Sequence, residues 1–202
     1  KKNTSICGLS VTIPHKQTVM NCLDEIDEAA KKIGAVNCIK IRHSEFGIRN
    51  LIGYNTDVYG FEKSLKPLLK PHHNKALILG TGGASKAAAF VLQKLKIEYL
   101  LVSRQENPAS EQHVLYADLD EKTISQNTLI INTTSLGMFP EVNVFPHIPY
   151  PFLTSNHLLF DLVYNPEETL FLKKGKEKGA EIKNGFEMLQ LQAEKAWEIW
   201  NE

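Results

Sequence analysis

Short apolar runs alternate along most of the chain with longer stretches of helical spacing. Apolar runs typical of strands buried on both faces of a parallel sheet occupy residues 76–79, 98–102, 129–132 and 158–163. Apolar residues with helical spacing follow at 83–95, 167–178 and 185–200, and weaker strands are expected at 114–117 and 180–183. This alternation predicts an α/β fold with a Rossmann-type, doubly wound parallel sheet.

The first 75 residues show a different order of elements and predict a smaller α/β lobe. A short strand at 9–13 is expected to lead into a helix that begins at Pro14, carries apolar residues at spacings of three and four, and ends at the C-cap Gly34. Its charged face would carry the pairs Asp27–Lys31 and Glu28–Lys32. The elements expected next are a hairpin with strands at 35–41 and 48–52 around the turn 43–47, a helix at 57–69 and a linker at 71–74.

A glycine-rich turn follows the first buried strand of the larger lobe. Gly80 and Gly82 lack side chains that would keep a pyrophosphate from the backbone, and a helix opening at Gly83 would point free N–H groups toward it. Ser85 occupies the position where the dinucleotide-binding motif has its third glycine. The turn predicts a nucleotide site, although a tight strand-to-helix turn without a ligand remains an alternative.

The end of the next strand indicates which dinucleotide would bind. An NAD enzyme usually has an acid there, about 20 residues after the first glycine, to bind the ribose 2′-hydroxyl. Here the position offers Ser103 and Arg104. A guanidinium pairs with a 2′-phosphate that an acid would repel, so the sequence favours NADP(H). The alternative is a solvated surface arginine.

Hydride transfer between a nicotinamide and an alcohol carbon also requires a group that moves the hydroxyl proton. Lys16, just after Pro14, and Asp57, at the start of a helix, are the candidates, because a carboxylate can orient a lysine and stabilise its charge. Each has a simpler interpretation: Lys16 as a solvated lysine, and Thr56 or Asp57 as a helix N-cap.

Composition narrows the class of ligand. Twenty-three basic residues balance 23 acidic ones among 202, so neither nucleic acid nor an anionic membrane is indicated, and a small molecule is the better expectation. No apolar run approaches the roughly 18 residues that a membrane span needs, which suggests a cytoplasmic protein. Three cysteines without a Cys-x-x-Cys pair, and histidines without metal-ligand spacing, predict no metal site.

An ordered set of motifs resembles the shikimate dehydrogenase family across nearly the whole chain. In chain order the set is Gly8-Leu-Ser-Val-Thr-Ile-Pro-His-Lys16, Gly34-Ala-Val-Asn37, Gly53-Tyr-Asn-Thr-Asp57 with Gly60, Gly80-Thr-Gly-Gly-Ala-Ser85, Ser103-Arg104, Asn132-Thr-Thr-Ser-Leu-Gly-Met138, Asp161-Leu-Val-Tyr-Asn-Pro166 and Gly185-Phe-Glu-Met-Leu-Gln-Leu-Gln192. The serine at position 85 belongs to the family's own form of the glycine turn.

The resemblance implies an NADP-dependent oxidoreductase that acts on a CH–OH group and reversibly reduces 3-dehydroshikimate to shikimate, toward chorismate and the aromatic amino acids. It implies Lys16 and Asp57 as the acid/base pair. The residues implied for the substrate are Thr12, Lys16, Asn37, Asp57, Tyr164 and Gln192. Those implied for NADP(H) are Gly80, Gly82, Gly83, Ala84, Ser85, Ser103, Arg104, Thr134, Ser135, Met138 and Gly185. A monomer or homodimer is expected.

The chain departs from the family pattern in ways that leave alternatives open. Ser10 and Cys38 replace an asparagine and a threonine, and no Ser-x-Ser pair for the substrate carboxylate precedes Gly8, so an N-terminally shortened chain is expected. The expected division is a substrate lobe at 1–60, an NADP domain at 61–183 and a returning helix at 184–202. Alternatives are a quinate/shikimate dehydrogenase with relaxed cofactor use, another two-lobed dehydrogenase of the methylene-tetrahydrofolate type, or an NADP-binding fragment without turnover.

Overall fold

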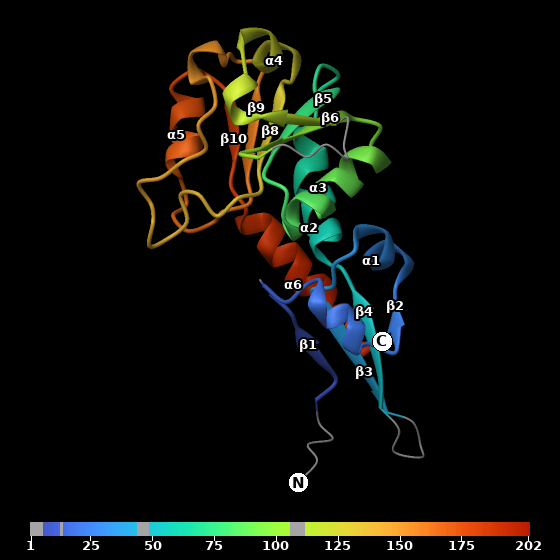
Figure 1. Ribbon diagram of the computed structural model, residues 1–202. Helices are drawn as coiled ribbons and strands as arrows, with labels where there is room; N and C mark the ends of the chain where they lie inside the picture. Colours follow the sequence, from blue (N-terminus) through green and yellow to red (C-terminus); the bar gives the residue numbers. More distant parts are fainter. Residues whose placement is uncertain (1–5, 13, 44–48, 106–111) are drawn as a thin grey trace.

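Two sheets organise the chain, and the helices α2 (Asp57–Leu65) and α6 (Phe186–Asn201) run between them (Figure 1). The computed structural model describes residues 6–12, 14–43, 49–105 and 112–202. Within these residues a six-stranded sheet forms the larger part of the molecule and a four-stranded sheet the smaller part. None of the helices in these ranges combines the length and the apolar character that crossing a membrane requires.

The larger sheet is parallel throughout, in the strand order β10-β9-β8-β5-β6-β7. Its strands are β5 (Lys75–Leu79), β6 (Glu98–Ser103), β7 (His113–Leu115), β8 (Leu129–Asn132), β9 (Leu158–Asp161) and β10 (Glu181–Lys183). The chain runs outward from β5 first through β6 and β7, and then on the other side through β8, β9 and β10. This confirms the predicted doubly wound sheet and puts its topological switch point between β5 and β8.

Helices cover both faces of the larger sheet. On one face α2 (Asp57–Leu65) and α3 (Gly83–Lys94) pack on buried residues of β5, β8 and β9, and the Phe61 and Phe160 rings meet edge to face at 5.1 Å. The other face is covered by α4 (Glu121–Gln126) and α5 (Leu170–Lys176). The sequence predicted no helix at α4, because six residues are too few to show a helical period; Asp120 caps it through the backbone N–H of Thr123.

The smaller sheet has the strand order β1-β3-β4-β2. Its strands are β1 (Gly8–Ser10), β2 (Glu25–Ile26), β3 (Cys38–His43) and β4 (Arg49–Tyr54). The antiparallel pairing of β3 with β4 confirms the predicted hairpin, whose turn at 44–47 lies outside the described residues. Only the first part of the strand expected at 9–13 forms, and Ile13 also lies outside the described residues.

The single helix predicted from Pro14 to Ile33 is wrong. A 3-10 helix at Thr18–Cys22, the strand β2 and the short helix α1 (Glu28–Ile33) take its place. Tertiary pairing overrides the helical period, since the Asp24 backbone N–H donates to Leu51 O at 3.0 Å and the Asp24 carboxylate accepts from the Leu51 N–H at 2.7 Å. Val19, Leu23 and Ile26 of this segment still share one core with Ala30, Val36 and Ile39, whereas Ile33 packs in the core of the larger sheet.

The predicted ion pairs Asp27–Lys31 and Glu28–Lys32 are replaced by other contacts, whereas the predicted C-cap at Gly34 is confirmed. Asp27 caps α1 by accepting from the Ala29 N–H at 2.9 Å, and Lys31 pairs with Glu28 at 2.8 Å. Gly34 has the left-handed conformation expected of a C-cap, with φ of 69°.

The last helix, α6 (Phe186–Asn201), connects the two parts. It begins beside the larger sheet, packs along α2 and ends on β3 of the smaller sheet. There the Trp200 indole N–H donates to Ile39 O at 3.1 Å, and Ala196 and Ile199 pack on Cys38. Because α2 packs on the larger sheet and α6 packs on both α2 and β3, the two helices connect the residues contributed by each part.

Candidate active site

A pocket of about 770 Å³, called the larger pocket below, lies at the carboxyl ends of β5, β6 and β8. Its lining consists of Gly80, Thr81, Gly82, Val102, Ser103, Arg104, Gln105, Tyr116, Thr133, Thr134, Ser135 and Leu136. In open α/β sheets ligands bind at this edge, next to the switch point. The predicted residues Gly80, Gly82, Ser103, Arg104, Thr134 and Ser135 are therefore brought together here.

The glycine turn between β5 and α3 has the shape that a phosphate-bearing ligand needs. Gly80 has φ of +107° and lies against Thr133 and Thr134, so a side chain would be strained there. A Cβ on Gly82 or Gly83 would meet nothing within 4 Å, so open space lies in front of the turn. The first N–H groups of α3 have no partner within their own helix, which favours an anion at this end.

Ser85, at the third position of the motif, has a role inside the turn. Its side chain is buried, and its hydroxyl donates to Gly82 O at 2.6 Å. The serine thereby closes the first turn of α3 onto the glycine before it.

Arg104 directly follows β6 and lines the larger pocket together with the glycine turn. The Ser103 hydroxyl organises the backbone around Arg104, because it donates to Gln105 O and also contacts His113 Nε2 at 2.7 Å. Burial raises the pKa of Tyr116, another lining residue, to about 12, although the nearby Arg104 opposes this shift. A dinucleotide carrying a 2′-phosphate fits this combination of an open glycine turn and a guanidinium.

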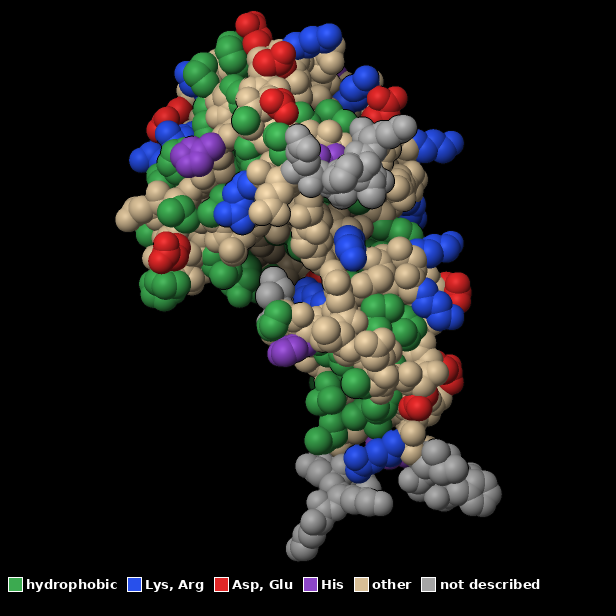
Figure 2. Space-filling view, in the orientation of Figure 1, with side chains coloured by type: hydrophobic (Ala, Val, Ile, Leu, Met, Phe, Trp, Pro, Cys, Tyr) green, Lys and Arg blue, Asp and Glu red, His purple; other side chains and the backbone are tan. Residues whose placement is uncertain are grey.

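The smaller pocket, of about 380 Å³, lies between the two parts of the molecule, and Figure 2 shows the surface hollowed there. Its lining consists of Ser10, Val11, Thr12, Lys16, Asn37, Asp57, Ala84, Leu162, Tyr164, Gly185, Met188, Leu189 and Gln192. Every residue implied for the substrate is in this set. Ala84 and Gly185, implied for the cofactor, line this pocket instead of the larger one.

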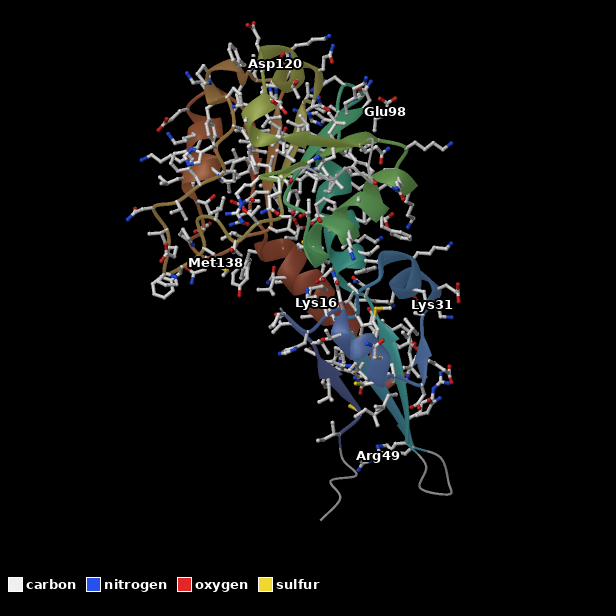
Figure 3. The ribbon with its side chains drawn as sticks, in the orientation of Figure 1. Lys16, Lys31, Arg49, Glu98, Asp120 and Met138 are labelled. Carbon is white, nitrogen blue, oxygen red and sulfur yellow. The ribbon has the colours of Figure 1, made fainter. Side chains whose placement is uncertain are left out.

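Met138 lies outside both sets of lining residues. Met138 is 46% exposed. It lies at the edge of the larger part that faces the smaller part, which carries Lys16 (Figure 3). Tyr164 is exposed to the same extent but borders the smaller pocket.

Lys16 and Asp57 form an ion pair at the wall of the smaller pocket. Lys16 Nζ lies 2.7 Å from Asp57 Oδ2, and the two side chains are only 18% and 12% exposed. Lys16 is anchored by its carbonyl, which accepts from the Val36 N–H at 2.7 Å, while Asp57 is the first residue of α2. A partly buried ammonium held by a carboxylate can exchange a proton with a ligand in the pocket.

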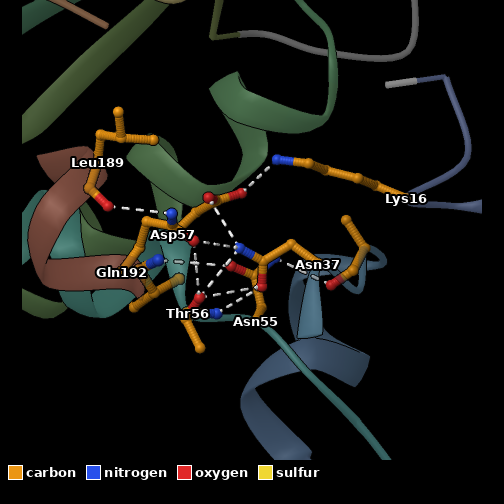
Figure 4. Close-up of polar contacts among 9 residues, drawn as sticks. Lys16, Asn37, Asn55, Thr56, Asp57, Leu189 and Gln192 are labelled. Carbon is orange, nitrogen blue, oxygen red and sulfur yellow. Dashed lines mark hydrogen bonds and ion pairs between the residues drawn. The ribbon is translucent and has the colours of Figure 1, made fainter. Parts of the chain in front are cut away.

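A network of neutral side chains surrounds this ion pair (Figure 4). The Asn37 amide donates to Asp57 Oδ1 at 2.9 Å, and its oxygen accepts from the Thr56 N–H at 2.7 Å. The Thr56 hydroxyl donates to Gln192 Oε1 at 3.3 Å, and the Gln192 amide donates to Leu189 O at 3.0 Å. The network links α6 to α2 and to the segment before β3, and so fixes the polar side of the pocket.

Several residues of the site were not found from the sequence. Thr56 stands at the N-cap position of α2, but its hydroxyl makes no capping bond and instead joins Asn37 to Gln192. The lining residues Tyr116, Leu162, Met188 and Leu189 are apolar or aromatic residues of ordinary elements, without a local signal that separates them from core residues. Only their place in the fold brings them to the pockets.

Comparisons with known proteins agree on one family. A family profile described as the shikimate dehydrogenase substrate binding domain matches residues 1–39. Shikimate dehydrogenase (NADP(+)) of Caldanaerobacter subterraneus subsp. tengcongensis is 41% identical over 212 residues, which are 98% of this chain and 74% of that protein. The crystal structure of shikimate dehydrogenase from Aquifex aeolicus superimposes with a TM-score of 0.83 at 35% identity, covering 97% of this chain and 72% of that one.

A second solved structure has ligands. It is shikimate 5-dehydrogenase from Thermus thermophilus in complex with NADP(H) and shikimate. It matches with a TM-score of 0.80 at 29% identity, over 98% of this chain and 74% of that one.

Proposed function

The chain belongs to the shikimate dehydrogenase family, and from this membership we propose how its residues carry out the reversible NADP(H)-dependent interconversion of shikimate and 3-dehydroshikimate. The chain is an NADP-dependent oxidoreductase, as its relatives are. The single observation that best supports an active site in this chain is the Lys16–Asp57 pair at 2.7 Å in the wall of the smaller pocket.

NADP(H) would be held in the larger pocket by the glycine turn, by Arg104 at the 2′-phosphate, and by Thr134 and Ser135. When bound, it supplies hydride transfer to or from the substrate carbon. Gly83, Ala84, Ser85, Ser103, Met138 and Gly185 complete the proposed cofactor residues. The proximity of the two pockets supports this assignment, because Ala84 follows Gly83 of the turn and also lines the smaller pocket.

Lys16 would move the proton. During reduction its Nζ gives a proton to the carbonyl oxygen that becomes the hydroxyl, and during oxidation it takes that proton back. Asp57 holds Nζ in place and stabilises the ammonium charge, while the amide of Asn37 supports the other carboxylate oxygen. A proton is thus available where charge would otherwise develop on the substrate oxygen.

The remaining polar residues of the smaller pocket would hold the substrate ring. Thr12, Asn37, Tyr164 and Gln192 offer hydroxyl and amide groups, which can match several hydroxyls at once and reject analogues that lack one. We further propose the substrate lobe at 1–60, the NADP domain at 61–183 and the returning helix at 184–202, acting as a monomer or homodimer. The contacts of α6 with β3 support the returning helix.

The substitution Lys16→Ala tests the proton-transfer role. We expect kcat with NADPH and 3-dehydroshikimate to fall by about 10²- to 10⁴-fold, while NADPH binding measured by fluorescence stays near wild type. Lys31→Ala is the matched control, since it removes the same charge from an exposed lysine of α1 that pairs with Glu28. Asp57→Asn should also reduce turnover severely.

Two outcomes would contradict parts of this proposal. Substantial turnover by Lys16→Ala would exclude Lys16 as the proton donor. NADPH binding by the wild-type chain without any turnover would favour a nucleotide-binding function. Steady-state rates with shikimate against quinate, and with NADP against NAD, measure the substrate and cofactor preference directly.

A further inference from the structure

A buried carboxylate that the proposed mechanism does not use lies at the carboxyl end of β9. Asp161 is fully buried, and neutral groups hold its two oxygens. Oδ1 accepts from the Asn132 amide at 2.9 Å and from the Val163 N–H at 3.0 Å, and Oδ2 accepts from the Thr169 hydroxyl at 2.6 Å. Burial raises the pKa of Asp161 to about 6 even though these donors favour its charged form. Keeping a carboxyl group here is costly, so its contacts need a reason beyond packing.

On one side Asp161 determines how the amide of Asn132 points. Asn132 ends β8, and because its Nδ2 faces Asp161, its oxygen faces the loop that follows. That oxygen accepts from the N–H of Thr134 at 3.1 Å and from its hydroxyl at 2.7 Å. The Thr134 hydroxyl in turn accepts from the Leu136 N–H at 3.2 Å. The two ends of an amide have almost the same shape, so an acceptor such as Asp161 selects the orientation that orders this loop.

On the other side Asp161 orders the chain after β9. By accepting from the Val163 N–H, it turns the backbone so that Leu162 and Tyr164 reach the smaller pocket. The Val163 carbonyl accepts from the Gly185 N–H at 3.1 Å, and Gly185 lies so close to Leu162 O that a Cβ has no room. The start of α6 is therefore docked on the segment that Asp161 holds.

We propose that Asp161 is a positioning residue for both pockets, an inference that rests on the proposed function for the identity of the ligands. Through Asn132 it sets the Thr133–Leu136 loop in the wall of the larger pocket, and through Val163 it sets Leu162 and Tyr164 in the smaller pocket. Asp161 itself lines neither pocket. Its loss would therefore weaken NADPH and substrate binding more than it slows the proton transfer at Lys16.

The test is a double-mutant cycle that combines Asp161→Asn with Asn132→Ala. The NADPH dissociation constant is measured by fluorescence, and KM and kcat are measured for NADPH and for 3-dehydroshikimate. Asp161→Asn replaces one of the two oxygens on which these three donors converge with an NH₂ group, so at least one donor loses its acceptor and we expect NADPH to bind about tenfold more weakly. KM for 3-dehydroshikimate should rise by at least about threefold, with a smaller fall in kcat. Asn132→Ala cuts the same link, so the double variant should bind NADPH within about twofold of the weaker single variant.

Thr169→Val is the matched control, because it removes one donor to Asp161 but leaves the bond to Asn132. It should lower Tm as Asp161→Asn does, yet leave NADPH affinity within about twofold of wild type. Equal effects of the two substitutions on Tm with no change in NADPH affinity would make Asp161 purely structural and overturn the proposal. If the losses of NADPH affinity in the two single variants multiply in the double variant, Asp161 does not act on the larger pocket through Asn132.

Three further outcomes are also informative. If Asp161→Asn does not fold, the NADPH affinity of Asn132→Ala alone serves as the test. Unchanged NADPH affinity in that variant overturns the proposal. A wild-type chain that fails to bind NADPH contradicts the cofactor assignment and this role together. Binding that neither substitution affects contradicts the positioning role alone and leaves the proposed function standing.

Discussion

At the scale of single residues, Gly82 faces open space, whereas Gly60 and Gly185 lie against the backbone of another segment. The Gly82 backbone is extended, with φ of −80° and ψ of −170°, and nothing lies within 4 Å of where a Cβ would be. Alanine can adopt this conformation without strain, so the fold itself does not require a glycine there.

The substitution Gly82→Ala should therefore separate binding from stability. We expect Tm to stay within about 1–2 °C of wild type, because the methyl group enters open space. NADPH affinity should fall about tenfold or more, since the methyl group would occupy the place where the pyrophosphate approaches the backbone. Thermal unfolding and fluorescence titration measure the two effects. A large loss of Tm with unchanged affinity would contradict this interpretation of the turn.

Asp161 also makes stability depend on pH. Burial raises its pKa in the folded protein to about 6, above the ordinary range near 4, so the folded chain binds this proton more tightly than the unfolded chain does. Its contribution to the free energy of unfolding is fully present below about pH 4 and is lost as pH rises through about 6. The loss amounts to roughly 2–3 kcal/mol.

Comparison of wild type with Asp161→Asn isolates this contribution, because asparagine does not titrate. The difference in unfolding free energy, wild type minus variant, should decrease between pH 4 and 6 in urea denaturation series. The lowered pKa values of Glu28 and Asp120 have the opposite effect on stability, but both proteins share them and they cancel. A difference that stays constant over this range would show that Asp161 has an ordinary pKa.

At the scale of elements, the contact between α2 and α6 connects the fold to the site. α2 carries Asp57 at its start and α6 carries Gln192, and the two helices pack at Gly60. A Cβ on Gly60 would lie 2.5 Å from Met188 O and 3.1 Å from Gln192 Cβ. The backbone of α6 can approach α2 this closely only because no side chain intervenes.

Gly60→Ala should consequently force the two helices apart. We expect a loss of about 1–3 kcal/mol in the free energy of unfolding. KM for 3-dehydroshikimate should rise, since Gln192 moves relative to Asp57. Lys63→Ala, at an exposed position on the same helix, is the control for a change in α2 that leaves the contact intact. Unchanged stability and KM in Gly60→Ala would contradict the close packing.

At the scale of the whole molecule, the two sheets lie on either side of α2 and α6 (Figure 1), and the smaller pocket between the two parts adjoins the glycine turn of the larger pocket at Ala84. The glycine turn and Arg104 belong to the larger part, whereas Lys16, Asn37 and Asp57 come from the smaller part and from α2. A ligand that fills the larger pocket stabilises the folded chain by mass action, because the unfolded chain has no such pocket.

NADPH at about 100 times its dissociation constant should add about 2.7 kcal/mol and raise Tm by roughly 5–10 °C. NADH at the same concentration should raise Tm less, because Arg104 then has no 2′-phosphate to pair with. Differential scanning fluorimetry measures both shifts. Equal shifts with the two cofactors would contradict the assignment of Arg104 to the 2′-phosphate.

The elements that the sequence predicted are those whose signals are local. The apolar runs of β5, β6, β8 and β9, the turn at Gly80 and the C-cap at Gly34 are confirmed, because a buried parallel strand or a left-handed turn restricts the residues within it. The ordered motifs also brought Lys16, Asp57 and Gln192 into one predicted site. That prediction depends on their order along the chain and does not require knowledge of their distances.

Tertiary structure decided the features in which a residue's partner is distant in sequence. The helix predicted at 14–33 does not form, because Asp24 hydrogen-bonds to Leu51 of β4 and because Val19, Leu23 and Ile26 reach a common core in another conformation. The Lys16–Asp57 pair, the hydroxyl of Thr56 and the buried carboxylate of Asp161 depend on contacts across 41, 136 and 29 residues. Local sequence restricts only backbone conformation and burial, whereas the fold alone sets such distances and thereby determines which polar groups meet.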